Sequence, residues 1–227
     1  MIATAKILVA WSTGKDSAWM LHALRERAGA HAVAALLTTT DVDDGRVGVH
    51  GVPRSLRLAQ AAATGLPAIE VPLPKARSNA AYEAGMAKAV AEARARFGVS
   101  HVAFGDLFLE DIRRYREKQF AGSGLELLFP LWELPTPSLA RDMIAGGLAA
   151  RLVVVDKTRL DAAFAGTLFD DALLGRLPPS VDPCGENGEF HTFAFDGPMF
   201  RAPVAHRLSR VREEERFAYA ELQGEEP

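Results

Sequence analysis

The feature that most constrains this chain is a short apolar run that leads directly into a polar loop. Residues 6–11 (KILVAW) are aliphatic and aromatic, as in a strand that is buried on both faces. Residues 12–17 (STGKDS) follow, and apolar positions from 16 to 27 then recur with helical spacing, with Gly29 placed as a C-cap. This order predicts the first strand, loop and helix of an α/β domain.

The same alternation continues along the first half of the chain. The predicted strands are 32–38, 67–71, 101–104 and 125–129, and the predicted helices are 53–64, 79–97 and 110–120. Repeated strand–helix units imply parallel strands joined by right-handed crossovers. The sequence therefore predicts an α/β fold built on a doubly wound, mostly parallel sheet.

The texture of the sequence changes beyond residue 130. Prolines punctuate this part, and its only compact strand signal is 152–155. We therefore expect a larger domain at 1–130 and a smaller C-terminal α/β portion at 131–227.

The loop at 12–17 has the composition of an anion-binding turn. Ligands of open α/β sheets bind at the carboxyl ends of the strands, where a helix N-terminus offers free N–H groups and the positive end of its dipole. Gly14 permits close approach of the backbone to an anion, and Lys15 adds a cation. Hydroxyl groups that can donate to phosphate oxygens belong to Ser12, Thr13 and Ser17.

Asp16 is the unusual member of this loop, because a carboxylate repels phosphate unless it holds a metal ion or caps the helix. Mg²⁺ that bridges to the phosphates is the natural partner. A P-loop of the Walker A type is excluded, since Val9 stands where it requires glycine, and a dinucleotide loop would need three glycines. A pyrophosphatase-type loop, usually written Ser-Gly-Gly-x-Asp-Ser, remains, with Thr13 at a glycine position. The alternative is an ordinary N-capped turn.

Two further islands concentrate acidic residues. Residues 105–111 (GDLFLED) set three carboxylates just after a predicted strand, on the same sheet edge as the loop, where Asp106 is a second candidate metal ligand. Residues 185–192 (GENGEFHT) pack two carboxylates, an amide and a histidine between glycines. The alternative for this second island is that its acids cap a turn and that His191 satisfies a backbone carbonyl.

Together, the loop and the two islands resemble the diphthine–ammonia ligase family, a branch of the N-type ATP pyrophosphatases, also called PP-loop or adenine nucleotide alpha-hydrolase-like proteins. Other similar stretches are 60–61, 65–67, 101–104, 130–132 and 182–200. The resemblance implies a Rossmann-like PP-loop (HUP) fold. The motif NGEFH and the Ala- and Arg-rich composition are typical of a bacterial-type member, which would exclude diphthine as the acceptor.

The resemblance implies adenylation chemistry. A substrate carboxylate would attack the α-phosphorus of ATP, pyrophosphate would leave, and ammonia or another amine would displace AMP to give an amide. The acceptor acid, a protein side chain or a small molecule, stays unidentified. Domain 1–130 would bind ATP and Mg²⁺, and 131–227 would bind the acceptor.

The resemblance also assigns roles to individual residues. The expected ATP-binding residues are Ser12, Thr13, Gly14, Lys15, Ser17, Thr38, Thr39 and Gly105, and the expected metal ligands are Asp16 and Asp106. The expected catalytic residues are Lys15, Asp16, Glu186, Glu189 and His191. The expected acceptor-side residues are His50, Glu186, Asn187 and Glu189, which would orient the amine or deprotonate it. Lys15 and Mg²⁺ would offset the charge that grows on the leaving pyrophosphate.

Composition narrows the partners and the compartment. The net charge of −3 argues against a broad nucleic-acid surface, so we interpret the basic run at 113–118 as a solvated helix face. Cys184 is the only cysteine, which excludes an intrachain disulfide and a Cys-based zinc site and favours the cytoplasm. No apolar run approaches the roughly 20 residues of a membrane span, and the first ten residues lack a signal-peptide pattern. A homo-oligomer is compatible with the sequence, which does not determine the oligomeric state.

Two alternative functions remain at this stage. One is a tRNA-modifying enzyme with the same nucleotide-binding fold, against which the net acidity and the lack of paired cysteines argue. The other is a non-catalytic module that binds adenine nucleotide through the loop without turnover.

Overall fold

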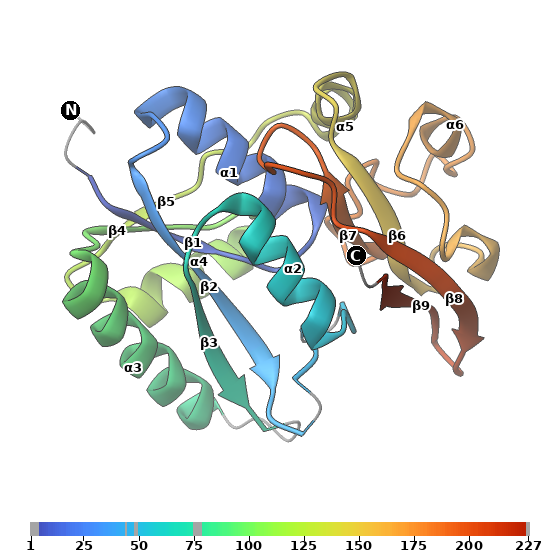
Figure 1. Ribbon diagram of the computed structural model, residues 1–227. Coiled ribbons are helices and arrows are strands. Elements are labelled where there is room, and N and C mark those ends of the chain that lie inside the picture. Colours follow the sequence, from blue (N-terminus) through green and yellow to red (C-terminus); the bar gives the residue numbers. More distant parts are fainter. Residues whose placement is uncertain (1–4, 44, 48–49, 75–78, 226–227) are drawn as a thin grey trace.

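The structure is a computed structural model that describes residues 5–43, 45–47, 50–74 and 79–225. Its first sheet has five parallel strands in the order β3-β2-β1-β4-β5 (Figure 1). They are β1 (Ile7–Ala10), β2 (Val33–Asp41), β3 (Ala68–Leu73), β4 (His101–Ala103) and β5 (Glu126–Leu128). This order is that of a doubly wound sheet, and its direction reverses between β1 and β4.

Helices cover both faces of this sheet. They are α1 (Lys15–Ala28), α2 (Arg54–Thr64), α3 (Asn79–Phe97) and α4 (Glu110–Phe120). Ile7 and Val9 of β1 pack in one core cluster with α1, whereas Leu8 between them packs with α3 in another. Since both faces of β1 are buried, its sequence is continuously apolar instead of alternating. The predicted doubly wound α/β fold is confirmed.

A second, antiparallel sheet has four strands in the order β7-β6-β9-β8. The strands are β6 (Ala149–Asp156), β7 (Phe190–Asp196), β8 (His206–Glu213) and β9 (Phe217–Gly224). The helices α5 (Thr136–Ala145) and α6 (Asp171–Leu174) and the short 3-10 helix η1 (Ala162–Phe164) accompany them. The expectation of one compact strand in this part is therefore wrong. The boundary placed near residue 130 falls between β5 and α5, and it stays a prediction.

The second sheet packs against the face of the first that carries α1 and α2 (Figure 1). Leu56 of α2 shares a core cluster with Val154 of β6 and Phe193 of β7, and the cluster that contains α1 continues into β6 and β7. Helices α1 and α2 therefore lie between the two sheets. Among the described residues, no helix combines the length and the apolar character needed to cross a membrane.

Gln60 of α2 joins the two sheets through buried hydrogen bonds. Its Oε1 accepts from Trp11 Nε1 at 2.7 Å, and its Nε2 donates to the carbonyls of Thr13 at 2.9 Å and Ala194 at 2.6 Å. The side chain is fully buried. One amide therefore fixes the end of β1, the following loop and β7 relative to one another.

We expect Gln60→Leu to lower the free energy of unfolding by roughly 2–4 kcal/mol, because an apolar side chain of similar size leaves buried polar partners unsatisfied. Urea unfolding monitored by circular dichroism measures this change. Gln223→Leu, at an exposed glutamine of β9, is the control and should cost less than ~1 kcal/mol. Equal losses in the two variants would contradict the proposed joining role of Gln60.

Candidate functional site

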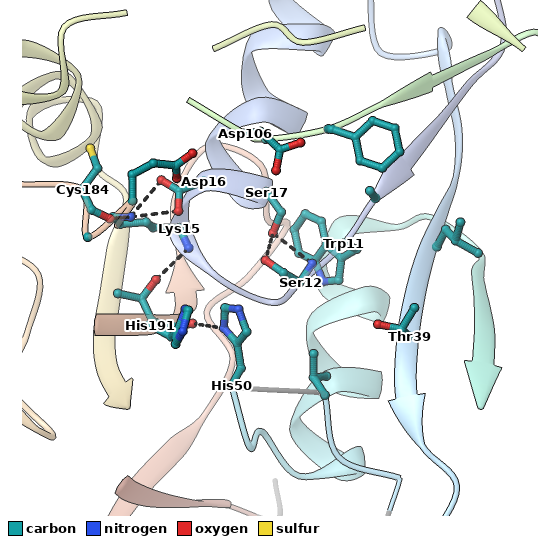
Figure 2. Close-up of a pocket in the computed structure, with 18 of the residues that line it drawn as sticks. Trp11, Ser12, Lys15, Asp16, Ser17, Thr39, His50, Asp106, Cys184 and His191 are labelled. Carbon is teal, nitrogen blue, oxygen red and sulfur yellow. Dashed lines mark hydrogen bonds and ion pairs between the residues drawn. The ribbon is translucent and has the colours of Figure 1, made fainter. Parts of the chain in front are cut away.

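A cavity of about 390 Å³ lies at the carboxyl ends of β1, β2 and β4 (Figure 2). It is lined by the loop after β1, by Thr39 of β2, by Gly105 and Asp106 after β4, and by residues 184–186 and 190–192 of the C-terminal part. β1 and β4 are the neighbours between which the strand order reverses, the usual position of ligands in such sheets. The cavity therefore lies where the sequence predicted a site, and the C-terminal part contributes one of its walls.

The loop after β1 turns sharply at Thr13, whose φ is +72°. A β-branched residue rarely adopts this conformation, which costs of order 1–3 kcal/mol and persists only where the surroundings impose it. The carbonyl of Thr13 accepts from the backbone N–H of Ala194 and from Gln60 Nε2, both at 2.9 Å. The side chain of Thr13 is fully buried and does not line the cavity, so its role in phosphate binding stays a prediction.

Helix α1 begins at the cavity without a side-chain cap. Its N-cap residue is Gly14, and the N–H of Lys15 donates to Thr192 Oγ1 of β7 at 3.0 Å. Asp16 and Ser17 complete the first turn, where backbone N–H groups have no partner within a helix. Both residues line the cavity. The turn therefore offers N–H donors and the positive end of a helix dipole to an anion.

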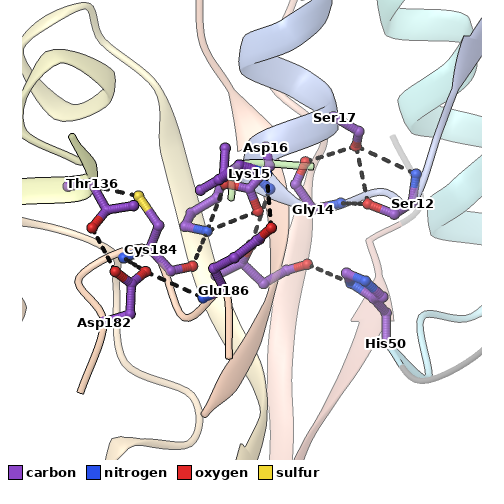
Figure 3. A network of polar contacts seen from close by, with 12 residues as sticks. Ser12, Gly14, Lys15, Asp16, Ser17, His50, Thr136, Asp182, Cys184 and Glu186 are labelled. Atoms are coloured by element: carbon purple, nitrogen blue, oxygen red, sulfur yellow. Dashed lines mark hydrogen bonds and ion pairs between the residues drawn. The ribbon is translucent and has the colours of Figure 1, made fainter. Parts of the chain in front are cut away.

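Ser12 and Ser17 place their hydroxyls side by side at this turn (Figures 2 and 3). The two Oγ atoms lie 3.2 Å apart, and Ser17 Oγ donates to the carbonyl of Gly14 at 3.0 Å. Gly14 itself does not line the cavity: a Cβ there would lie 3.0 Å from His50 Cε1 and 3.2 Å from the carbonyl oxygen of Thr192. The absence of a side chain on Gly14 therefore leaves room for His50 and Thr192 to pack against it, not for a ligand.

Gly105 serves a similar purpose on the other side of the turn. A Cβ on Gly105 would lie 3.2 Å from the backbone carbonyl of Asp16. The end of β4 can therefore approach the first turn of α1 closely. Gly105 and Thr39 line the cavity, whereas Thr38 is buried and does not. The assignment of all three residues to the nucleotide stays a prediction.

Lys15 carries a buried ammonium group. Its Nζ lies 2.8 and 2.9 Å from the two carboxylate oxygens of Asp16 and donates to the carbonyl of Cys184 (Figure 3). It also lies 5.5 and 5.6 Å from the ring centroids of Phe169 and Phe190. Burial lowers the pKa of Lys15, but the charge and hydrogen bond of Asp16 and the other nearby groups raise it above its ordinary value. The ammonium therefore stays charged.

This orientation differs from the one expected of a phosphate-binding lysine. The Lys15 side chain lines the cavity, but its ammonium contacts Asp16 and the C-terminal segment. In the structure it joins the first turn of α1 to the segment that precedes β7. Contact with pyrophosphate stays a prediction for this residue.

Three carboxylates, those of Asp16, Asp106 and Glu186, line the cavity. Burial raises the pKa of Asp106, which Arg116 lowers and Asp16 raises further. Burial raises the pKa of Glu186 to about 7 despite a hydrogen bond from the N–H of Leu107 at 2.8 Å, and the charges of Asp16 and Asp106 add to the rise. The three acids therefore repel one another, and a bound cation would relieve that repulsion.

Asp106 offers a further sign of a cation site. Its Oδ2 is buried and forms an ion pair with Arg116 Nε at 3.5 Å, but none of the described residues donates a hydrogen bond to it in good geometry. The described part of the chain holds no group of three His, Cys, Asp or Glu side chains that could surround a metal ion. Mg²⁺ usually binds through one or two carboxylates with water and substrate phosphates, and Asp16 and Asp106 fit that donor set.

Arg116 is a cavity residue that the sequence analysis placed on a solvated helix face. Its guanidinium lies 4.8 Å from the Phe104 ring centroid, and Nη1 donates to Tyr82 Oη at 3.4 Å. Arg113 one turn earlier does pair with Glu117, at 3.0 Å. The solvated-face interpretation is therefore wrong for Arg116. One feature of the sequence could have indicated this position. Helix α4 begins only a few residues after Asp106, so one face of the helix lies next to the site.

Two neutral histidines lie next to each other in the lining of the cavity. The rings of His50 and His191 are 4.9 Å apart, and His50 Nδ1 lies 3.0 Å from the carbonyl oxygen of Thr192, so this nitrogen carries the proton. Burial lowers the pKa of both rings, that of His191 to about 3, and the nearby charge of Lys15 lowers the pKa of His191 further. His50 and His191 therefore line the site uncharged.

Glu189 and Asn187 lie outside the cavity lining. Glu189 is buried, and its Oε1 accepts from the N–H of Asp182 and from Asn187 Nδ2, both at 3.1 Å. These contacts brace the turn before β7, as the alternative interpretation of this island described. The catalytic and substrate roles assigned to Glu189 and Asn187 stay predictions, and Glu110 and Asp111 also do not line the cavity.

Comparison with known proteins connects this site to one group. Residues 136–222 match the family model described as diphthamide synthase C-terminal domain. The chain is 33% identical over 85 residues to a diphthine–ammonia ligase of Schizosaccharomyces pombe and 30% identical over 143 residues to one of Mus musculus. These matches cover 36% and 48% of this chain but only 14% and 51% of the relatives. The chain thus spans about half, or less, of the curated relatives that it matches.

A solved structure is similar at a lower level. It is described as a predicted subunit of tRNA methyltransferase from Methanocaldococcus jannaschii, with a TM-score of 0.42 and 13% identity over 84% of this chain and 96% of that chain. The topology of the two sheets defines the fold of this chain.

The state of His191 yields a pH prediction. Its pKa is near 3 in the folded chain and 6.5 ordinarily, so below about pH 6.5 the unfolded chain gains a proton that the folded chain does not. Stability from the neutral ring is present above pH 6.5 and lost as the pH falls toward 3. We expect the wild type to lose up to ~1.4 kcal/mol per pH unit more than His191→Gln between pH 6.5 and 4. Urea unfolding at each pH measures this, and parallel losses would contradict the buried, neutral ring.

Proposed function

From the match of residues 136–222 to the diphthamide synthase C-terminal domain and the similarity to diphthine–ammonia ligases, we propose that this chain is an ATP-dependent, AMP-forming amide ligase. It would adenylate a substrate carboxylate, release pyrophosphate, and join the acid to ammonia or another amine. The observation that carries the proposal is one cavity in which the uncapped first turn of α1 faces residues 184–192 of the C-terminal part. An anion-binding turn and an acceptor wall would both be needed for such a reaction.

The first turn of α1 would bind the phosphates of ATP. The N–H groups of Asp16 and Ser17 supply donors, and the adjacent hydroxyls of Ser12 and Ser17 can rotate toward phosphate oxygens. These groups are held in place by Thr13 and Thr192, so little reorganisation would accompany binding. Donors fixed in this way stabilise the charge that develops on a leaving pyrophosphate.

Asp16 and Asp106 would hold Mg²⁺. The buried Oδ2 of Asp106 without a hydrogen bond and the mutual repulsion of the cavity carboxylates support this assignment. When bound, the ion supplies positive charge next to the phosphates, which offsets charge on the leaving group. Arg116, 3.5 Å from Asp106, adds a fixed cation to the same wall.

Glu186 and His191 would face the acceptor and the amine. Glu186 accepts a hydrogen bond from the N–H of Leu107 and lines the same cavity as His50 and His191. An attacking amine must be neutral, so a carboxylate that first binds ammonium and then accepts its proton suits the second step. The neutral ring of His191 can accept a hydrogen bond from the amine.

The reaction is tested by isotope exchange between pyrophosphate and ATP in the presence of Mg²⁺ and a mixture of carboxylic acids, followed by ammonium chloride with analysis of the nucleotide products. The proposal predicts equal amounts of AMP and pyrophosphate. ADP as the main product would contradict it, and ATP binding without AMP in any acceptor mixture would favour a non-catalytic module.

We expect Asp106→Asn to lower the rate of AMP formation at least ~100-fold, because it removes a carboxylate proposed to hold the metal ion beside the phosphates. Asp111→Asn is the matched control: this exposed carboxylate of α4 lies five positions along the chain and outside the cavity lining. Its rate should stay within about twofold of the wild type. Equal rates for Asp106→Asn and the wild type would remove Asp106 from the mechanism.

A further inference from the structure

A second cavity of about 390 Å³ lies at the opposite edge of the first sheet, at the amino ends of its parallel strands. It is lined by Lys6 before β1, Arg25 in the last turn of α1, His31 before β2, Gly65 after α2, and Arg201 of the C-terminal part. It shares no lining residue with the first cavity. Whatever binds here is therefore separate from the proposed ligase chemistry.

The ionisable side chains that line this cavity are all basic. They are Lys6, Arg25, His31 and Arg201, and none of the carboxylates in the described part of the chain lines the cavity. Within the described residues, Lys6, Arg25 and Arg201 form no ion pair. Burial lowers the pKa of Arg25, and the charge of Arg201 lowers it further, so the two guanidinium groups repel each other. A chain with a net charge of −3 thus gathers positive charge at one place.

Arg25 is held firmly but incompletely satisfied. Its Nη1 donates to the carbonyl of Met199 and its Nη2 to the carbonyl of Thr64, both at 2.8 Å. Its Nε is buried and has no hydrogen-bond partner among the described residues. A buried donor without an acceptor is destabilising, and an anionic oxygen that reached it would satisfy it.

Arg201 is placed beside Arg25 by features that the proposed ligase does not use. Its backbone N–H donates to the carbonyl of Ala63 at 2.8 Å. Its guanidinium packs on Gly65, where a Cβ would lie 2.3 Å from Arg201 Cζ, and Gly65 has a φ of +72° as the C-cap of α2. A side chain at position 65 would displace Arg201. The glycine of the stretch 65–67 therefore makes room for a cation.

Helix dipoles account for part of this arrangement. Helices α1, α2 and α3 end near the cavity, and cations are stabilised near helix C-termini. Arg25 binds the carbonyl of Thr64, the last residue of α2, and also the carbonyl of Met199, which lies outside any helix. Lys6 Nζ donates to the carbonyl of His31 at 3.0 Å, just after α1. Each helix end carries only about half a charge, however, and Arg201 has no side-chain hydrogen bond among the described residues.

We propose that this basic cavity binds a small molecule that carries phosphate. Two guanidinium groups and an ammonium match phosphate oxygens, for which arginine supplies a planar fork of donors. The volume lies within the range of roughly 300–1,000 Å³ for small-molecule sites and exceeds the need of a single ion. The ligand would bridge α1 and the C-terminal part through Arg25 and Arg201.

The test is calorimetric titration of inorganic phosphate, pyrophosphate and AMP into the full chain in magnesium-free buffer with EDTA. We expect binding to the wild type, and Arg201→Gln and Arg25→Gln to weaken the tightest of these ligands at least ~10-fold, by loss of a charge-assisted hydrogen bond. Arg27→Gln is the matched control: it removes the same charge from the last turn of α1, outside the cavity, and should change binding less than about twofold.

Comparison of the three ligands separates a site for free phosphate from one for a nucleotide. If Arg25→Gln does not fold, the result for Arg201→Gln tests the proposal, because the Arg201 side chain is exposed and its replacement should not disturb folding. The proposal is overturned if none of the ligands binds the wild type, if Arg201→Gln binds them as tightly as the wild type, or if Arg27→Gln weakens binding equally. A short single-stranded RNA that binds more tightly than pyrophosphate would overturn the assignment to a small molecule.

Discussion

The buried ammonium of Lys15 is the interaction on which the rest of the first cavity depends. A charge removed from water is tolerated only when it is paired and hydrogen-bonded, and the partners here come from two parts of the chain. Asp16 is its neighbour in α1, whereas the Cys184 carbonyl and the ring of Phe190 belong to the segment that leads into β7. The same charge therefore orients Asp16 and holds the C-terminal wall against the first turn of α1.

The remaining charges of the cavity follow from this closure. With the C-terminal segment in place, Glu186 is brought near Asp16 and Asp106, and burial raises the pKa values of Glu186 and Asp106. Lys15 and Arg116 offset only part of this negative charge. An anion-binding turn beside an acidic wall suits an anionic substrate that binds together with a cation. The carboxylates would repel the anion alone, and the cation offsets their charge. The chemistry proposed for the cavity rests on that balance.

The sequence predicted the first sheet well because its strands and helices have local signals: KILVAW is continuously apolar, and 79–97 has helical spacing that the structure matches as Asn79–Phe97. In the second sheet, β8 has no local signal because it is an exposed edge strand with arginines at 207, 210 and 212 and no buried face to impose alternation. β9 does alternate, with Ala218, Ala220 and Leu222 buried, and that signal was overlooked. Candidate residues at strand ends, such as Asp106, do line the cavity, because the carboxyl ends of neighbouring parallel strands meet at one edge of the sheet, and their roles there stay predictions. Gln60 and Thr192 were given no role there, because Lys15 meets Thr192 across 177 positions and no local pattern encodes that contact.

The most direct test of the central claim is a crystal structure with Mg²⁺ and a non-hydrolysable ATP analogue. We expect the triphosphate to contact the N–H groups of Asp16 and Ser17 at the start of α1, with the metal ion between the carboxylates of Asp16 and Asp106 and the α-phosphate facing Glu186. A triphosphate bound away from this turn, or a metal ion held by neither carboxylate, would contradict it.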